Sequence, residues 1–202
     1  MKKKELEIIL QGVPDFTNPR IRFEQYLTPA VIAADMIFEA YKFGDVNKKQ
    51  VADLGCGTGI FSVGAYLLGA KRVVGFDCEK DCIEIAKNHA KKFNFDITFF
   101  EKDVSEVSTS CDTVIMNPPF GAQKSNYQAD RKFIEKAIEI AQVVYSLHLS
   151  KTIPFIFKLI SALGCEISHS KEYVFPIKGM HTFHKKQLIN FDVSMIRVIS
   201  ST

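Results

Sequence analysis

The segment Val51-Ala-Asp-Leu-Gly-Cys-Gly-Thr-Gly59 joins a short apolar run to a turn that holds three glycines. The run at residues 51–54 fits a buried strand, and the apolar residues after Gly59 fit a helix that extends to about residue 68. Glycine allows positive φ angles and lets a backbone approach a ligand closely. The spacing G-x-G-x-G differs from the G-x-G-x-x-G of dinucleotide-binding folds. The segment therefore predicts a strand, a ligand-binding turn and a helix, in that order.

Strands and helices alternate over most of the chain on both sides of this segment. Apolar patterns predict strands near residues 72–76, 97–100, 113–116 and 143–147, and helices near residues 1–12, 30–43, 80–93, 132–142 and 152–163. Two further strands, near residues 165–175 and 191–199, fit an antiparallel pair. We therefore expect an α/β fold with a mainly parallel seven-stranded sheet, an antiparallel C-terminal strand pair and helices on both faces.

The pair Thr28-Pro29 predicts the start of one of these helices. Threonine is a common N-cap residue, and proline is favoured at the first helical position. We therefore expect Thr28 to cap the helix that follows.

The chain has 202 residues, a net charge of +3 and five scattered cysteines. This length predicts a single domain over residues 1–202, with an N-terminal helical segment at 1–45 and an α/β core at 46–202. The charge allows a nucleic-acid partner without requiring one. Because the chain has no C-x-x-C pair and no apolar run of about 18 residues, we expect reduced thiols, a cytoplasmic location and no membrane span.

Acidic residues follow two of the predicted strands. Asp77 ends the strand after the glycine turn, and Asp103 and Val104 follow the next strand. Ligands of such sheets bind beyond the carboxyl ends of the strands. We expect Asp77 to accept hydrogen bonds from two ribose hydroxyls, and Asp103 and Val104 to contact an adenine ring and its amino group. Ordinary polar turns and a nicotinamide-dinucleotide site remain alternatives, although the glycine spacing does not favour the latter.

Several motifs together resemble a known family. D-x-G-x-G-x-G at residues 53–59, the acidic strand end at Asp77 and N-P-P-F at residues 117–120 resemble class I S-adenosylmethionine-dependent methyltransferases of the adenine-N6 type. The blocks "EQYLTP" (24–29), "VVYSLH" (143–148) and "FHKK" (183–186) resemble the methyltransferase-like protein 5 family of ribosomal RNA adenine methyltransferases. This resemblance covers the chain from about residue 20 to residue 198, and it implies a Rossmann-like class I methyltransferase fold.

The resemblance also implies a cofactor, S-adenosyl-L-methionine, and residues that bind it. The block that lies over the cofactor contributes three of them, the glycine loop five, and later strand ends the remainder. These cofactor-binding residues are Gln25, Tyr26, Thr28, Asp53, Gly55, Cys56, Gly57, Gly59, Asp77, Cys78, Asp103, Val104 and Asn117. Some members of the family work with a small zinc-containing activator protein, which makes such a protein a candidate partner here.

The catalytic group is expected to be Asn117, Pro118, Pro119 and Phe120. The lone pair of the adenine amino nitrogen is delocalised into the ring, so catalysis needs acceptors that hold the two amino hydrogens. The side-chain oxygen of Asn117 and the carbonyl of Pro118 can accept one hydrogen each, and the prolines fix the local φ. Phe120 can stack on a base that has left its helix or loop. The alternative is a strand that two prolines terminate, followed by a core phenylalanine.

Phe183, His184, Lys185 and Lys186 are the expected RNA-binding residues, because aromatic and basic side chains suit stacked bases and phosphates. A solvated hairpin loop is the alternative, and we expect no metal site. The sequence thus predicts an enzyme that methylates N6 of an adenine in RNA, with ribosomal RNA as the favoured substrate. Two other functions stay open. One is methylation of the glutamine N5 of a release factor, and the other is binding of S-adenosylmethionine or RNA without catalysis.

Overall fold

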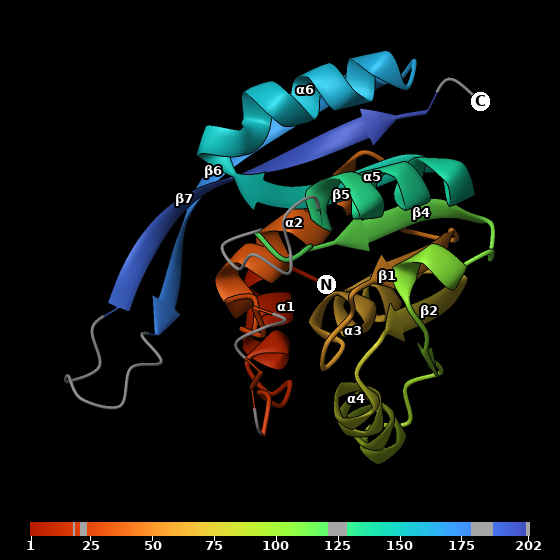
Figure 1. The fold of residues 1–202 in the computed structure, drawn as a ribbon. Helices are drawn as coiled ribbons and strands as arrows, with labels where there is room; N and C mark the ends of the chain where they lie inside the picture. The colour runs from red at the N-terminus through yellow and green to blue at the C-terminus, as the bar shows by residue number, and fades with distance from the viewer. Residues whose placement is uncertain (18, 21–23, 121–128, 179–187, 201–202) are drawn as a thin grey trace.

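A computed structural model describes residues 1–17, 19–20, 24–120, 129–178 and 188–200 of the chain. Seven strands form one sheet in the order β3-β2-β1-β4-β5-β7-β6 (Figure 1). Five of them run parallel, and β7 pairs antiparallel with both β5 and β6. The strands are β1 (Gln50–Leu54), β2 (Arg72–Asp77), β3 (Thr98–Glu101), β4 (Cys111–Met116), β5 (Ala141–Leu149), β6 (Glu166–Lys178) and β7 (Leu188–Ile199). The predicted sheet and its antiparallel C-terminal pair are confirmed.

Helices cover both faces of the sheet, because neighbouring residues of each central strand point to opposite faces. Val51 packs with the N-terminal helices and α3, whereas Ala52 packs with α5 and α6. The helices are α1 (Lys3–Leu10), α2 (Ala30–Lys42), α3 (Ile60–Leu67), α4 (Lys80–Lys92), α5 (Ala129–Ile140) and α6 (Ile153–Ala162). Helix α4 packs its apolar face on Phe99 of β3. Short 3-10 turns, η2 (Val104–Glu106) and η4 (Ser150–Thr152), follow β3 and β5.

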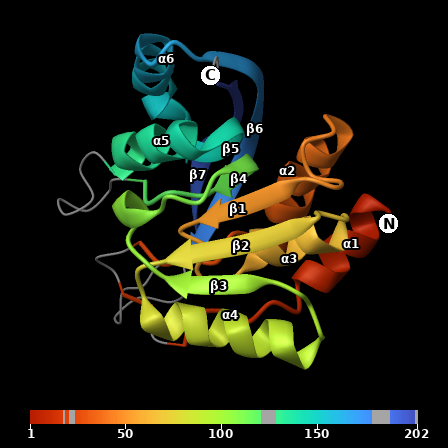
Figure 2. The same ribbon diagram turned by 90° about the vertical axis from the view of Figure 1, so that its right-hand side faces the viewer.

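The parallel strands end on a common edge. Figure 2 shows β1, β2 and β3 side by side, with their arrowheads on the same side of the molecule. The register agrees, because Leu54 at the end of β1 lies beside Phe76 of β2 and Met116 of β4. The glycine turn, Asp77 and Asn117 follow these three residues, so the fold brings them to one edge of the sheet.

The structure differs from the prediction at the start of α2. The N-cap residue is Pro29 rather than Thr28, and no side chain caps the helix. Thr28 is buried, and its hydroxyl accepts a hydrogen bond from the Asn117 side chain instead. Strand β5 also begins at Ala141, two residues earlier than expected, because its pairing with β4 starts opposite Cys111.

Candidate active site

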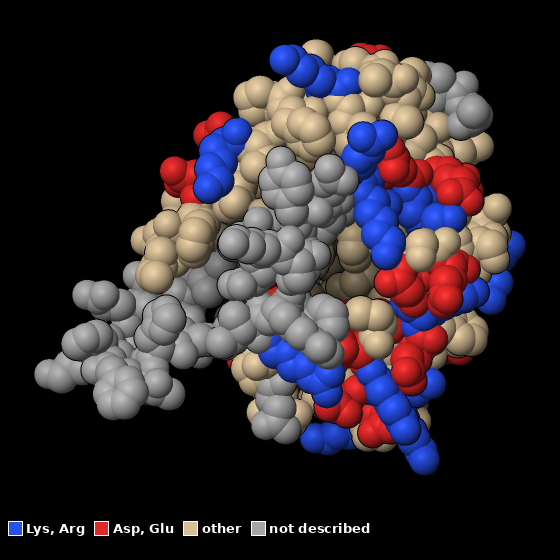
Figure 3. Space-filling model, viewed as in Figure 1, with Lys and Arg blue, Asp and Glu red and all other residues tan. Residues whose placement is uncertain are grey.

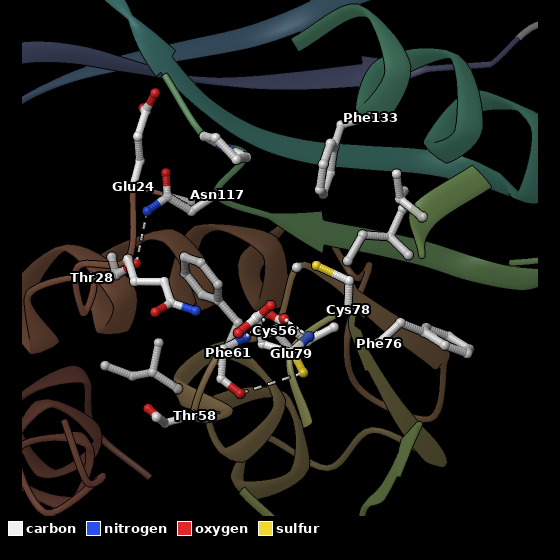
Figure 4. Close-up of a pocket in the computed structure, with 18 of the residues that line it drawn as sticks. Glu24, Thr28, Cys56, Thr58, Phe61, Phe76, Cys78, Glu79, Asn117 and Phe133 are labelled. Carbon is white, nitrogen blue, oxygen red and sulfur yellow. Dashed lines mark hydrogen bonds between the residues drawn. The ribbon is translucent and has the colours of Figure 1, made fainter. Parts of the chain in front are cut away.

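A cavity of about 450 Å³ opens at the carboxyl edge of the sheet (Figure 4). Its walls come from the segment before α2, the glycine turn, the ends of β2 and β3, the residues after β4, and α5. Twelve of the residues predicted from the sequence line it: Gln25, Tyr26, Thr28, Gly55, Cys56, Gly57, Asp77, Cys78, Asp103, Val104, Asn117 and Pro119. Segments that are far apart in the sequence therefore contribute to one site.

Four predicted residues do not line the cavity. Asp53 precedes the glycine turn and Gly59 is its last residue, and both are buried; Pro118 and Phe120, which follow Asn117, are buried as well. The predicted RNA-binding residues, Phe183 to Lys186, lie outside the described part of the chain.

The three glycines of the turn have positive φ angles, which other residues rarely adopt. Gly55, Gly57 and Gly59 have φ angles of 69°, 52° and 93°, which favour glycine. A Cβ atom on Gly57 would lie 3.0 Å from the ring of Phe16, and one on Gly59 would lie 3.0 Å from the ring of Phe99. Glycine is therefore needed both for the backbone angle and for the close approach of two rings.

Asp77 holds the turn in place. Its Oδ2 accepts a hydrogen bond from the Gly57 N–H at 2.8 Å, and its Oδ1 accepts one from the Glu79 N–H at 2.9 Å. Burial raises the pKa of the Asp77 carboxyl, although these hydrogen bonds oppose the shift. A carboxylate has about four acceptor positions, so the Asp77 carboxylate has capacity for a further donor.

Asp53 lies below the turn and is almost fully buried. Its Oδ2 accepts hydrogen bonds from the Ser62 N–H (2.9 Å) and hydroxyl (2.7 Å), which ties β1 to α3. Its Oδ1 has no hydrogen-bond partner among the described residues. Burial raises the pKa of Asp53 to about 7, because the hydrogen bonds from Ser62 compensate only partly for lost hydration. Asp53 thus supports the cavity from behind.

Asn117 lies at the end of the cavity nearest the start of α2 (Figure 4). Its Nδ2 donates a hydrogen bond to the Thr28 hydroxyl at 3.0 Å. Its Oδ1 is buried and has no hydrogen-bond partner in the described residues. A buried acceptor without a donor is costly, so this atom marks a place where a ligand N–H fits.

Phe120 is packed in an aromatic cluster and is only 6% exposed. Its ring centroid lies 5.4 Å from that of Tyr26 and 5.9 Å from that of Phe175 on β6. Tyr26 separately contacts Phe175 edge-on at 5.4 Å. Stacking of Phe120 on a base would therefore require its ring to turn out of this cluster.

Several cavity residues were not predicted as site residues from the sequence. Phe133 of α5 lines the cavity, and its ring would lie 3.1 Å from a Cβ on Gly55. Phe16, Glu24 and Phe61 also line the cavity, together with Glu79, Lys102 and Lys132. The sequence did offer a signal for Glu24, because this residue begins the block "EQYLTP", which resembles the methyltransferase-like protein 5 family.

Two ion pairs involve charged residues that line the cavity. Glu79 contacts Arg20 at 2.9 Å, and Asp103 contacts Lys132 at 2.7 Å. Hydrogen bonds from Lys132 and Ser105 lower the pKa of Asp103 to about 2, against the raising effect of burial. Asp103 therefore carries a negative charge at neutral pH.

This sheet order, glycine turn and acidic strand end define a class I methyltransferase, whose methyl donor is S-adenosyl-L-methionine. The described residues fit that donor. The free acceptor capacity of Asp77 suits a ribose, and the cavity combines apolar side chains with a few polar groups.

Comparisons with known proteins show which methyltransferases this chain resembles. A family model described as the methyltransferase small domain matches residues 32–143. METTL5 of Danio rerio, named as an rRNA N(6)-adenosine-methyltransferase, is 39% identical over 98% of each chain. Protein MJ0284 of Methanocaldococcus jannaschii is 38% identical over 98% of this chain and 94% of that one. The crystal structure of PH1948 from Pyrococcus horikoshii superposes with a TM-score of 0.92 at 39% identity, and covers 100% of this chain and 99% of that one.

The chain therefore belongs to the methyltransferase small domain family, in the branch that contains METTL5. A Methanocaldococcus jannaschii protein named as an N5-glutamine methyltransferase is also similar, at 38% identity, but over only 44% of this chain and 45% of that one.

Proposed function

We propose that this protein transfers a methyl group from S-adenosyl-L-methionine to N6 of an adenosine in ribosomal RNA. The observation that carries the proposal is the buried Asn117 Oδ1, which has no hydrogen-bond partner among the described residues and lies at the end of the cavity. Relatives named as rRNA N(6)-adenosine-methyltransferases, which match nearly the whole chain, support the choice of acceptor.

Asn117 acts by holding the amino group of the target base. When bound, S-adenosyl-L-methionine supplies an electrophilic methyl group. The Asn117 Oδ1 accepts a hydrogen bond from one N6–H, and the Pro118 carbonyl accepts a hydrogen bond from the other. Together these bonds turn the nitrogen lone pair toward the methyl group. Thr28 fixes the orientation of the amide through its hydrogen bond to Nδ2. The oxygen is therefore oriented before the base enters.

The other cavity residues hold the donor. Asp77 accepts hydrogen bonds from the ribose with its remaining lone pairs, and Asp103 and Val104 contact the adenine ring. Phe16 and residues 24–28 also line the cavity.

A release-factor glutamine is the alternative acceptor. An amide nitrogen poses the same lone-pair problem as an adenine amino group, so Asn117 would serve either substrate. The N5-glutamine relative matches less than half of this chain, whereas the rRNA methyltransferases match almost all of it. RNA is therefore the favoured substrate.

RNA would contact the face around the cavity. Lys and Arg side chains are intermixed with Asp and Glu on this face rather than gathered in one patch (Figure 3). We assign phosphate and base contacts to Phe183, His184, Lys185 and Lys186, whose aromatic and basic side chains suit single-stranded RNA.

A small zinc-containing protein is the proposed partner. Strand β3 is an edge strand of the sheet, and the nearby Phe93 and Phe100 are 49% and 46% exposed. Exposed strand edges and apolar side chains suit a protein interface. The cytoplasm is the proposed compartment, because all five cysteines are free thiols. No helix in the described ranges is both long and apolar enough to cross a membrane.

Methyl transfer to RNA tests the proposal directly. The protein is incubated with labelled S-adenosyl-L-methionine and either unmodified ribosomal subunits, naked ribosomal RNA or a release factor, and the products are digested and identified. N6-methyladenosine at one position of ribosomal RNA is the expected product. Labelled N5-methylglutamine, or cofactor binding without transfer to any acceptor even when a zinc-containing partner is added, would contradict the proposal.

A further inference from the structure

His148 is a fully buried histidine that the proposed mechanism does not use. It lies near the end of β5, and both of its ring nitrogens have a side-chain partner. The Nδ1 atom lies 2.8 Å from Asp130 Oδ1, and the Nε2 atom lies 2.7 Å from the hydroxyl oxygen of Ser146. Because a carboxylate accepts hydrogen bonds, Nδ1 donates to Asp130, and the Ser146 hydroxyl can donate to Nε2 or accept from it. The three side chains therefore form one continuous set of hydrogen bonds.

These hydrogen bonds join the end of β5 to the start of α5. Alternate residues of a strand point to the same face, so Ser146 and His148 share the face of Val144, which packs in the core beneath α5 and α6. Asp130 lies in the first turn of α5. In the register of the sheet, Ser146 lies beside Met116, the last residue of β4. The start of α5 is therefore attached next to the carboxyl end of β4.

The start of α5 also supplies two residues that line the cavity, Lys132 and Phe133. The Lys132 Nζ atom lies 2.7 Å from the Asp103 carboxylate, and the Phe133 ring would lie 3.1 Å from a Cβ atom on Gly55. With about 3.6 residues in each turn of an α-helix, Asp130 shares one turn with both cavity residues. The position of this turn therefore determines how Lys132 and Phe133 face the cofactor.

Burial makes the contact between His148 and Asp130 important for that position. The side chain of His148 is 0% exposed and that of Asp130 is 14% exposed. Loss of a hydrogen-bond donor to a buried carboxylate is costly, because little water can replace the donor. Without the Nδ1 donor, Asp130 could regain hydration only by moving toward solvent, and the first turn of α5 would move with it.

We propose that His148 is a positioning residue for the cofactor. Through Asp130 it holds the first turn of α5 in the place where Lys132 and Phe133 bind S-adenosyl-L-methionine. His148 acts at a distance, because it is not among the described residues that line the cavity. This role concerns the methyl donor, and it is the same whether the methyl acceptor is an adenosine or a glutamine.

Two substitutions of His148 separate its two hydrogen bonds. In His148→Asn the amide nitrogen can take the place of Nδ1 and donate to Asp130, whereas in His148→Gln it can take only the place of Nε2. The control is His89→Gln, which changes another buried histidine, on α4, that packs on Phe93 and does not line the cavity. Calorimetry of the RNA-free protein measures the affinity for S-adenosyl-L-methionine, and thermal unfolding measures the stability of each variant.

The affinity for S-adenosyl-L-methionine should fall about 10-fold or more in His148→Gln and stay within about threefold of normal in His148→Asn. His89→Gln should lower the unfolding temperature but bind the cofactor normally. Asp130→Ala removes the same contact from its other side, so it should weaken binding as His148→Gln does. The double variant should bind no more weakly than either single variant, because the two substitutions remove one contact.

Two results would overturn the role of His148. One is an equal affinity of His148→Asn and His148→Gln, because only the asparagine keeps the contact with Asp130. The other is equal weakening by His148→Gln and His89→Gln, because loss of stability alone would then explain both. The calorimetric test contains no RNA, so a failure of the proposed function on ribosomal RNA is detected separately.

Discussion

At the residue scale, the proposed methyl transfer depends on one atom, the Oδ1 of Asn117, which is buried and has no hydrogen-bond partner among the described residues. We predict that Asn117→Ala lowers the rate of methyl transfer by about 100-fold to 1,000-fold, as loss of one preoriented hydrogen-bonding group does in other enzymes. The affinity for S-adenosyl-L-methionine should change little, because the proposed partner of this oxygen is the target base and not the cofactor. Single-turnover rates and calorimetric titration measure the two effects. Full turnover by the variant would show that Asn117 does not hold the target amino group.

Substitution of Asp77 should weaken the binding of the cofactor, which substitution of Asn117 should leave nearly unchanged. Asp77→Asn keeps the size of the side chain but removes the charge and one acceptor, so the affinity for S-adenosyl-L-methionine should fall about 10-fold to 100-fold. The exposed Asp81 nearby provides the control Asp81→Asn, which should bind the cofactor normally. Calorimetry of the RNA-free protein measures both. Equal affinities for the two variants would remove Asp77 from the cofactor site.

At the scale of elements, a buried polar network fixes α2 to the sheet. Asp45, just after α2, accepts hydrogen bonds from the Tyr145 hydroxyl of β5 (2.6 Å) and from Arg197 Nε of β7 (2.8 Å). Arg197→Met would remove both hydrogen bonds that Arg197 donates to the buried Asp45, from Nε to Oδ2 and from Nη2 to Oδ1. We expect a loss of about 2 kcal/mol in the free energy of unfolding. Urea unfolding monitored by circular dichroism measures the loss. The exposed Arg72→Met on β2 is the control, and an equal change in both variants would contradict the importance of the network.

For the whole molecule, Asp53 predicts a dependence of stability on pH. Its pKa is about 7 in the folded protein, above the value of about 3.9 for an unfolded aspartate. A raised folded pKa gives stability that is fully present below the unfolded pKa and is lost as the pH rises through the folded pKa. The contribution of Asp53 should therefore decline between about pH 4 and pH 7, with a slope of at most about 1.4 kcal/mol per pH unit.

Asp53→Asn should remove this part of the pH dependence, because an amide does not ionise. Unfolding of the cofactor-free protein by urea, repeated across that pH range, measures the slope for both proteins. The free energy of unfolding should change less steeply with pH for Asp53→Asn than for the unchanged protein. An unchanged slope would show that other groups cause the dependence, among them Asp77, whose pKa burial also raises.

The sequence by itself determined the layout of the fold and the strand ends at which the site lies. The periodicity of apolar residues and the position of glycines influence the conformation of a few neighbouring residues. These local signals therefore predicted the strands, most helices and the turn at residues 55–59. Parallel strands then had to end on one edge, and this placed Asp77 and Asn117 together.

Only the tertiary structure decided how side chains from distant segments meet. Thr28 matches a helix cap in the sequence, but the folded chain brings it to the Asn117 amide, 89 residues away. The ring of Phe120 is buried because Tyr26 and Phe175 close around it. Such contacts depend on the three-dimensional path of the chain, which local propensities do not encode, and they set the chemistry at the Asn117 end of the cavity.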